Sequence, residues 1–170
     1  MVLSLDLSTK SSGWAIYEDK KLKDYGCITS ASTDVIKRIH IMIDNIKNII
    51  ENNKDIKKIV VEEVRPEGGY GIGNLQTHKV LMYLQAALEF LIHDFFKNIE
   101  IIYIYPSSWR SVCGISTGRG IKRTTLKEAD IAFVKEKFNI EVNDDIADAI
   151  CIGYAYLNPE KEIKELNWGE

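Results

Sequence analysis

The order of hydrophobic periodicities along the chain constrains the fold more strongly than any other feature of the sequence. Apolar, β-branched and aromatic residues first fill three short segments that turn-forming residues separate, namely 2–7, 14–17 and 22–28. From residue 33 the period changes to that of a helix, and two further strand-like segments then alternate with helical stretches, at 56–62 and 99–105. An antiparallel three-stranded meander followed by strand–helix–strand units predicts a mixed five-stranded α/β sheet with helices on both faces.

Residues typical of helix ends define the expected helices. Thr33 is expected to cap a helix whose apolar face runs from Val35 to Ile50. Thr125 and Glu128 fit a capping box, which predicts a helix over 126–138. The other expected helices cover 75–95, part of 107–123, and the stretch from Asn143 to about Leu157.

The length of 170 residues suits one domain with its own hydrophobic core. We expect that domain to cover residues 1–158 and to be followed by an acidic C-terminal tail over 159–170. No apolar run reaches the roughly 18 to 20 residues of a membrane helix, and the start of the sequence lacks the pattern of a signal peptide. The scattered Cys27, Cys113 and Cys151 form no CxxC pair, so we expect reduced thiols and an intracellular protein.

Acidic residues stand where burial should make them costly. Asp6 lies within the apolar run Val-Leu-Ser-Leu-Asp-Leu, and Glu62 ends the run Lys-Ile-Val-Val-Glu. Asp145 and Asp148 open a helix that is otherwise almost entirely apolar, and their i, i+3 spacing places them on one face. An unpaired buried carboxylate costs several kcal/mol, so such groups usually pair with a cation or bind a metal.

A divalent cation is the expected partner of these acids, because the same segments offer no matching set of lysines or arginines. Magnesium prefers oxygen ligands and shares phosphate oxygens of a substrate, and two such ions about 4 Å apart support phosphodiester hydrolysis. Each acid also has a simpler interpretation by itself: Asp6 as a turn residue, Glu62 or Glu63 as a solvated side chain, and Asp144 or Asp145 as a helix cap. Asp144 is the more cap-like of the last two, but Glu63 and Asp144 stay open as alternative ligands.

The motifs around these acids resemble those of the RuvC family of Holliday junction resolvases, which have an RNase H-like fold. The resemblance rests on Leu5-Asp6-Leu7-Ser8 with Gly13, on Val60-Val61-Glu62-Glu63-Val64, and on Asp145-Ile146-Ala147-Asp148-Ala149-Ile150. It implies that the catalytic metal ligands are Asp6, Glu62, Asp145 and Asp148, with two Mg²⁺ ions per active site that Mn²⁺ can replace. It also implies a homodimer that makes paired nicks across a four-way DNA junction, with roles in DNA recombination and repair.

Two segments depart from the bacterial RuvC pattern. Residues 8–13, Ser-Thr-Lys-Ser-Ser-Gly, replace the usual Pro-Gly-rich turn after the first aspartate, and residues 106–110, Pro-Ser-Ser-Trp-Arg, also differ. The compact form resembles a phage or viral relative, so the expected location is the cytoplasm of a bacterial cell or of a phage-infected host. The resemblance leaves open whether the substrate is strictly a four-way junction or branched DNA in general, and which sequence is cut.

A basic stretch without acids supplies candidate DNA contacts, although the net charge of the whole chain is −3. Between Pro106 and Lys127 there is no acidic residue, and we expect the basic side chains to contact phosphates, namely Arg110, Arg119, Lys122, Arg123 and Lys127. A solvated charged loop is the alternative interpretation. Tyr70, in the glycine-rich loop after Glu62, is expected to stack on or wedge between bases.

The helix expected over 75–95 is apolar on more than one face. One side suits the sheet, and the other suits either an isologous dimer contact or the C-terminal helices.

Three other functions remain open from sequence alone. An ATP-binding half of the actin-like or sugar-kinase type has the same element order, but 170 residues leave no room for a second lobe and no P-loop motif occurs. A YqgF-like RNA-processing nuclease would use the same metal chemistry on another substrate. A non-catalytic nucleic-acid-binding module is the third, and the intact set of acids argues against it.

Overall fold

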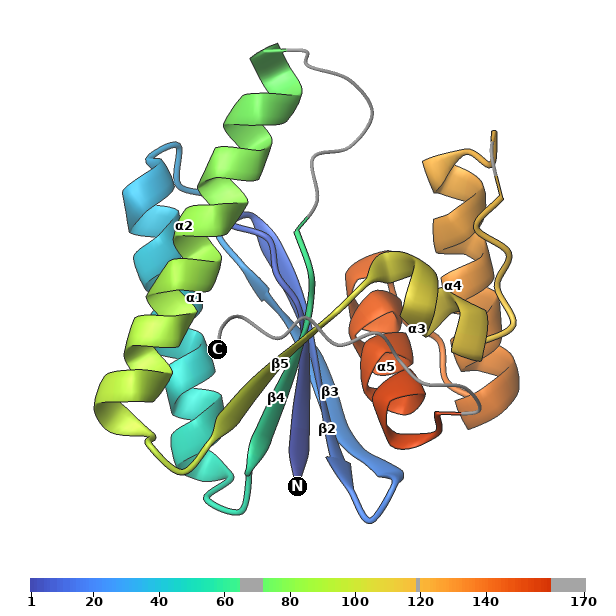
Figure 1. Cartoon of the computed structure of the whole chain (residues 1–170), viewed down its shortest axis with the longest axis horizontal. Coiled ribbons are helices and arrows are strands. Elements are labelled where there is room, and N and C mark those ends of the chain that lie inside the picture. Colours follow the sequence, from blue (N-terminus) through green and yellow to red (C-terminus); the bar gives the residue numbers. More distant parts are fainter. Residues whose placement is uncertain (65–71, 119, 160–170) are drawn as a thin grey trace, which may run out of the picture.

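The computed structural model describes residues 1–64, 72–118 and 120–159. In this part of the chain, five strands form a mixed sheet in the order β3-β2-β1-β4-β5 (Figure 1). The strands are β1 Val2–Asp6, β2 Ser11–Glu18, β3 Lys21–Thr29, β4 Lys58–Glu62 and β5 Glu100–Ile104. β1 pairs antiparallel with β2 and parallel with β4, so the first strand lies at the centre of the sheet. The predicted meander and the parallel units that follow it are confirmed.

Helices cover both faces of the sheet, as the hydrophobic pattern predicted. α1 and α2 lie on one face, and α3, α4 and α5 lie on the other (Figure 1). Their bounds are α1 Val35–Asn52, α2 Ile72–Phe95, α3 Pro106–Val112, α4 Arg123–Phe138 and α5 Asp144–Leu157. Among the described residues, no helix has the length and apolar character needed to span a membrane.

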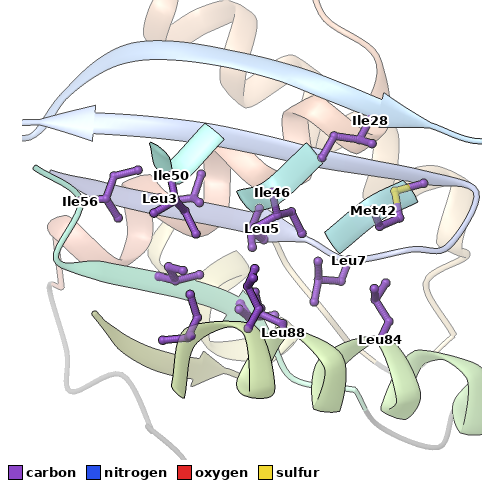
Figure 2. Close-up of a cluster of buried hydrophobic side chains, with 14 of the residues drawn as sticks. Leu3, Leu5, Leu7, Ile28, Met42, Ile46, Ile50, Ile56, Leu84 and Leu88 are labelled. Atoms are coloured by element: carbon purple, nitrogen blue, oxygen red, sulfur yellow. The ribbon is translucent and has the colours of Figure 1, made fainter. Parts of the chain in front are cut away.

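The alternation of side chains along β1 divides the core into two halves. Leu3 and Leu5 are fully buried and face α1 and α2 (Figure 2). They pack there with apolar side chains of both helices, among them Met42, Ile46, Leu84 and Leu88. Ser4 lies between the two leucines and faces the other way, where its Oγ donates a hydrogen bond to the carbonyl oxygen of Ala149 in α5 at 2.7 Å. The period of two in the sequence thus separates the two helix layers.

Close contact between α5 and the sheet depends on a residue without a side chain. A Cβ at Gly153 would lie 2.4 Å from the ring of Tyr17 and 2.6 Å from Ser4 Oγ. The absence of that atom lets the Tyr17 hydroxyl donate a hydrogen bond to the carbonyl oxygen of Ile150 at 2.7 Å. Two buried hydroxyl groups of the sheet, those of Ser4 and Tyr17, are therefore satisfied by the backbone of α5.

The caps of α1 and α5 differ from the predicted ones. Asp34, not Thr33, caps α1, and its Oδ1 accepts a hydrogen bond from the backbone N–H of Lys37 at 3.1 Å. Asn143 caps α5 through its bond from the N–H of Ile146 at 3.0 Å, so the prediction that Asp144 is cap-like is wrong. Aspartate and asparagine are among the strongest capping residues, which accounts for both positions.

The predicted capping box of α4 is not formed. The helix begins at Arg123, with Lys122 in the cap position and no side-chain capping bond, so Thr125 already lies inside the helix. The sequence pattern therefore located the helix correctly but not its first turn. Cys27, Cys113 and Cys151 are free thiols, as expected.

Candidate active site

Two of the predicted acids lie side by side because their strands are parallel neighbours. Asp6 is the last residue of β1 and Glu62 the last residue of β4. In the register of these strands Leu5 pairs with Val61, so the next residue of each strand emerges at the same edge of the sheet. The core on both faces of the sheet therefore holds the two carboxylates at one end of β1 and β4.

α5 brings the other two acids to this edge. Gly13 of β2 pairs with Asp6, and it approaches the first turn of α5 so closely that a Cβ would lie 1.8 Å from the carbonyl oxygen of Asp145. Asp148 follows one turn later and is buried. The close approach at Gly13 is thus what places Asp145 beside the end of β1.

A cavity of about 630 Å³ joins these groups. All four predicted acids line it, together with the buried Glu63. Basic side chains from α3 and α4 and His78 from α2 also line it, the basic ones being Arg110, Arg123 and Lys127. The cavity is therefore lined both by a cluster of carboxylates and by cationic groups.

Burial and mutual repulsion disfavour negative charge on two of the acids. Burial, reinforced by the charges of Glu62 and Asp145, raises the pKa of Asp6 to about 8. Burial, reinforced by the charge of Asp6, raises the pKa of Asp148 to about 10. In the absence of a cation, the cluster therefore retains protons at neutral pH.

The donor set fits a hard divalent cation. Asp148 Oδ1 is buried and has no hydrogen-bond partner within the part of the chain that the structure describes, which leaves one carboxylate oxygen for a ligand. Oxygen ligands of this kind are what Mg²⁺ and Mn²⁺ prefer. The acids line one cavity without forming a ready ligand set, however, since no group of three acids, histidines or cysteines among the described residues is arranged to hold a metal ion.

Hydrogen-bond donors and a cationic group of the protein lie beside the acids. Ser11 Oγ donates a hydrogen bond to Asp145 Oδ2. Trp109 Nε1 donates to Glu62 Oε2 at 2.7 Å, and Arg110 Nη2 lies 3.8 Å from Asp148 Oδ2. Sequence reasoning missed Ser11 and Trp109, because only the tertiary fold brings the β1–β2 turn and α3 to the acids.

The segments that carry the acids offer no basic partners, but two other helices bring basic side chains close to them. Arg110 reaches Asp148 from α3, but its main partner is Asp130 of α4, whose Oδ2 accepts bonds from Nη2 at 3.0 Å and Nε at 3.2 Å. Lys127 forms an ion pair with Asp144, and this hydrogen bond lowers the pKa of Asp144. Asp144 is therefore a paired surface acid.

The predicted DNA-contacting residues fall into three groups. The Arg110 side chain is only 11% exposed and is held by Asp130, so it belongs to the cavity wall and not to an open loop. Lys122 and Arg123 are exposed at the start of α4, and Lys127 is half-buried beside them. Tyr70 and Arg119 lie outside the described residues.

The alternative of a solvated Glu63 is also wrong. Glu63 follows β4 directly, is 7% exposed, and its backbone N–H donates to the carbonyl oxygen of Ile104 at 2.9 Å. Both glutamates line the cavity, and Glu62 is the one that ends the strand beside Asp6.

Comparison with solved structures shows that the chain has an RNase H-like fold similar to that of RuvC. Thermus thermophilus RuvC has a TM-score of 0.66 at 12% identity, over 97% of this chain and 99% of that one. T. thermophilus RuvC in complex with a Holliday junction substrate has a TM-score of 0.68 at 12% identity, over 97% and 98%. The yeast mitochondrial Holliday junction resolvase Ydc2 has a TM-score of 0.57 at 15% identity, over 92% and 77%. No protein-family model and no curated protein matches the sequence.

Proposed function

We propose that this protein is a metal-dependent endonuclease that cleaves branched DNA, with the four-way junction as its main substrate. One observation carries the proposal: Asp6, Glu62, Asp145 and Asp148 come from three elements of a RuvC-type fold and line one cavity. The solved structures that share this fold include a RuvC bound to a Holliday junction and the resolvase Ydc2. Chemistry of the site and likeness of the fold thus support the same class of reaction.

The four acids would hold Mg²⁺, or Mn²⁺ in its place, with two ions per site as the working arrangement. Bound ions of this kind activate a water molecule and stabilise the leaving oxygen of a phosphodiester. The protein contributes position and environment: β1 and β4 hold Asp6 and Glu62 at one edge, and α5 adds Asp145 and Asp148. The raised pKa values of Asp6 and Asp148 supply an electrostatic reason for the cluster to take up a cation, because a cation relieves the repulsion between the acids.

The basic wall of the cavity suits the DNA backbone. Lys122 and Arg123 are exposed at the start of α4, and Arg123 and Lys127 line the cavity that holds the acids. Phosphate contacts of this kind orient a duplex without reading its sequence. Arg119 and Tyr70 stay in the proposal as flanking contacts, Tyr70 by stacking on bases.

A homodimer is part of the proposal, because symmetric cutting of a junction needs two sites. α2 turns its inner face to the core through Leu84 and Leu88, and it exposes apolar residues on the other side. The exposed ones are Leu75, Met82, Tyr83 and Phe90. A self-complementary contact between two such faces would be isologous.

The test is cleavage of a labelled four-way DNA junction, with duplex, single-stranded, forked and RNA four-way substrates beside it, in Mg²⁺ and in EDTA. Asp148→Asn removes one acid of the cavity, and Asp44→Asn, an exposed position on α1, is its matched control. We expect junction cleavage that needs Mg²⁺, that falls roughly 100-fold or more in Asp148→Asn, and that is unchanged in Asp44→Asn.

Each other outcome changes the proposal in a defined way. Equal cutting of forks and junctions would make the protein a nuclease for branched DNA in general. Cleavage of the RNA substrate alone would favour the YqgF-like function. Binding of the junction by folded protein without any cleavage, in Mg²⁺ or Mn²⁺, would favour a non-catalytic binding module.

A further inference from the structure

Two consecutive residues of α3 contact two acids that come from different elements. Trp109 Nε1 donates a hydrogen bond of 2.7 Å to Glu62, the last residue of β4. Arg110 Nη2 lies 3.8 Å from Asp148, in the first turns of α5. Successive residues of a helix point in directions about 100° apart, so α3 must lie between β4 and α5 for both contacts to form.

Strand register accounts for the position of α3. β5 runs parallel to β4, and Ile104 pairs with Glu62, so the chain leaves β5 at the edge of the sheet where the acids lie. Pro106 then occupies the first turn of α3, where its fixed φ angle favours a helix start. Trp109 follows within that helix and is fully buried, so its indole ring is held against the core while its N–H reaches Glu62.

An acid outside the cavity lining holds the arginine. Asp130 of α4 is fully buried and does not line the cavity with the other acids. Its Oδ2 accepts bonds from Nη2 of Arg110 at 3.0 Å and from Nε at 3.2 Å. The guanidinium also stacks on Trp109, with 4.0 Å between its central carbon and the ring centroid. Arg110 is therefore fixed from two sides, and the Nη2 nitrogen that binds Asp130 is also the one that lies 3.8 Å from Asp148.

We propose that Trp109, Arg110 and Asp130 form a positioning network that orients Glu62 and Asp148 for cation binding. This inference rests on the proposed function, since it assumes that these two carboxylates share a divalent cation. Trp109 orients Glu62, and Asp130 keeps Arg110 close enough to Asp148 to orient it but too strongly engaged to replace the cation. Loss of groups that orient metal ligands typically weakens metal binding 10- to 100-fold, so we expect an effect of about 10-fold for each of two variants.

The two variants remove single features of the network. Trp109→Phe deletes the N–H donor and keeps most of the buried ring. Asp130→Asn deletes the charge that holds Arg110, and it also alters the side-chain hydrogen bond between Asp130 and Asp148. Trp14→Phe, at a partly buried position that packs against the core on the α1 side of the sheet, is the matched control for the loss of an indole. Asp44→Asn on α1 is the control for the loss of one negative charge at a position away from the cavity.

The measurement is Mn²⁺ affinity of the full chain without DNA, by calorimetry, for the wild type and the four variants. A second readout is the indole N–H cross-peak of Trp109 in a ¹⁵N–¹H spectrum, assigned by its disappearance in Trp109→Phe. We expect this peak to move when Mg²⁺ is added, while the peak of Trp14 stays in place. The spectrum uses wild-type protein, so it decides the role of Trp109 even if Asp130→Asn does not fold.

The outcomes separate this inference from the proposed function. The network would be overturned if Trp109→Phe and a folded Asp130→Asn bound Mn²⁺ within twofold of the wild type. It would also be overturned if the Trp109 peak did not move when Mg²⁺ is added. Cleavage by the wild type would stand in both cases. Weaker binding by both variants, in a protein that cuts no nucleic acid, would overturn the proposed function and leave the network in place. A wild type that binds no Mn²⁺ would overturn both.

Discussion

Asp6 lies at the end of a strand whose preceding residues are packed in the core, and it shares its surroundings with Glu62 and Asp145. Burial first, and then these two negative charges, raise its pKa from the ordinary 3.8 to about 8. Between these two values the folded chain binds more protons at Asp6 than the unfolded chain does. The free energy of unfolding of the metal-free protein therefore falls as the pH rises through this range.

Asp6→Asn should remove this fall in the free energy of unfolding at high pH. In EDTA at pH 8 we expect the variant to be more stable than the wild type by about 0.5–2 kcal/mol, as is common when a strained functional group is replaced. At pH 4 the difference should vanish, because Asp6 is then largely protonated in the folded wild type as well. Urea unfolding at both pH values measures the effect, with Asp44→Asn as control. A gain in stability that is equal at pH 4 and pH 8 would contradict the assigned cause.

Added Mg²⁺ should reverse the order of stability at pH 8. A ligand that binds only the folded state stabilises it by an amount that grows with the logarithm of its concentration. We expect the midpoint of wild-type unfolding to rise with Mg²⁺ and that of Asp6→Asn to rise much less. Equal responses of the two proteins would place the cation elsewhere.

At the scale of elements, the contact between β2 and α5 decides whether the site forms. Gly13 gives α5 the space to reach the sheet, since a Cβ there would lie 1.8 Å from the carbonyl oxygen of Asp145. That oxygen belongs to the backbone, so a clash can be relieved only by movement of the whole first turn of α5. The position of Asp145 therefore depends on a residue that carries no functional group.

Gly13→Ala should displace the first turn of α5 and destabilise the fold by about 1–3 kcal/mol or more, as overpacking does. Cleavage should fall further than the loss of folded protein explains, because the acids would be misplaced. Gly118→Ala is the matched control, since the nearest atom to its added Cβ would be at 3.8 Å. Urea unfolding and junction cleavage of both variants check the prediction, and equal stability of the two would count against it.

Elements were predictable from sequence where hydrophobic period alone determines them, and contacts between elements were not. The apolar runs that end at Asp6 and Glu62, and the apolar helix after Asp145, predicted three elements that line the cavity. The partners of these acids depend on how α3 and α4 pack on the sheet. No local pattern indicates that Arg110 binds Asp130, which lies on another helix.

At the scale of the whole molecule, a chain of net charge −3 must attract DNA through a local basic surface. Lys122 is exposed at the start of α4, near the cavity that Arg123 and Lys127 line. If Lys122 contacts one phosphate, Lys122→Ala should reduce the slope of log affinity against log salt concentration by about 0.9. Lys54→Ala, at an exposed residue beyond the C-terminus of α1, should leave the slope unchanged. Junction binding in EDTA over a range of salt concentrations measures both, and equal slopes would remove Lys122 from the interface.

The exposed face of α2 leads to a prediction about assembly. Phe90 is 70% exposed on this helix, and a lysine there would place a charge in the proposed dimer contact. Phe90→Lys should shift the protein toward the monomer, whereas Ile36→Lys, at a 55% exposed apolar position on α1, should not. Sedimentation equilibrium of the wild type and both variants measures this. A wild type that is monomeric at all concentrations would exclude the dimer.

The pairing of β1 with α5 also determines when the site can exist during protein synthesis. Ser4 and Ala149 are joined by a hydrogen bond across 145 residues, and β1 leaves the ribosome long before α5 is translated. Until residues 144–157 have emerged and packed on the sheet, the nascent chain lacks Asp145 and Asp148. Contacts this distant in sequence form late in folding. On the proposed function, the unfinished chain therefore cannot cut DNA. Cleavage becomes possible only after α5 has been translated and has packed on β1.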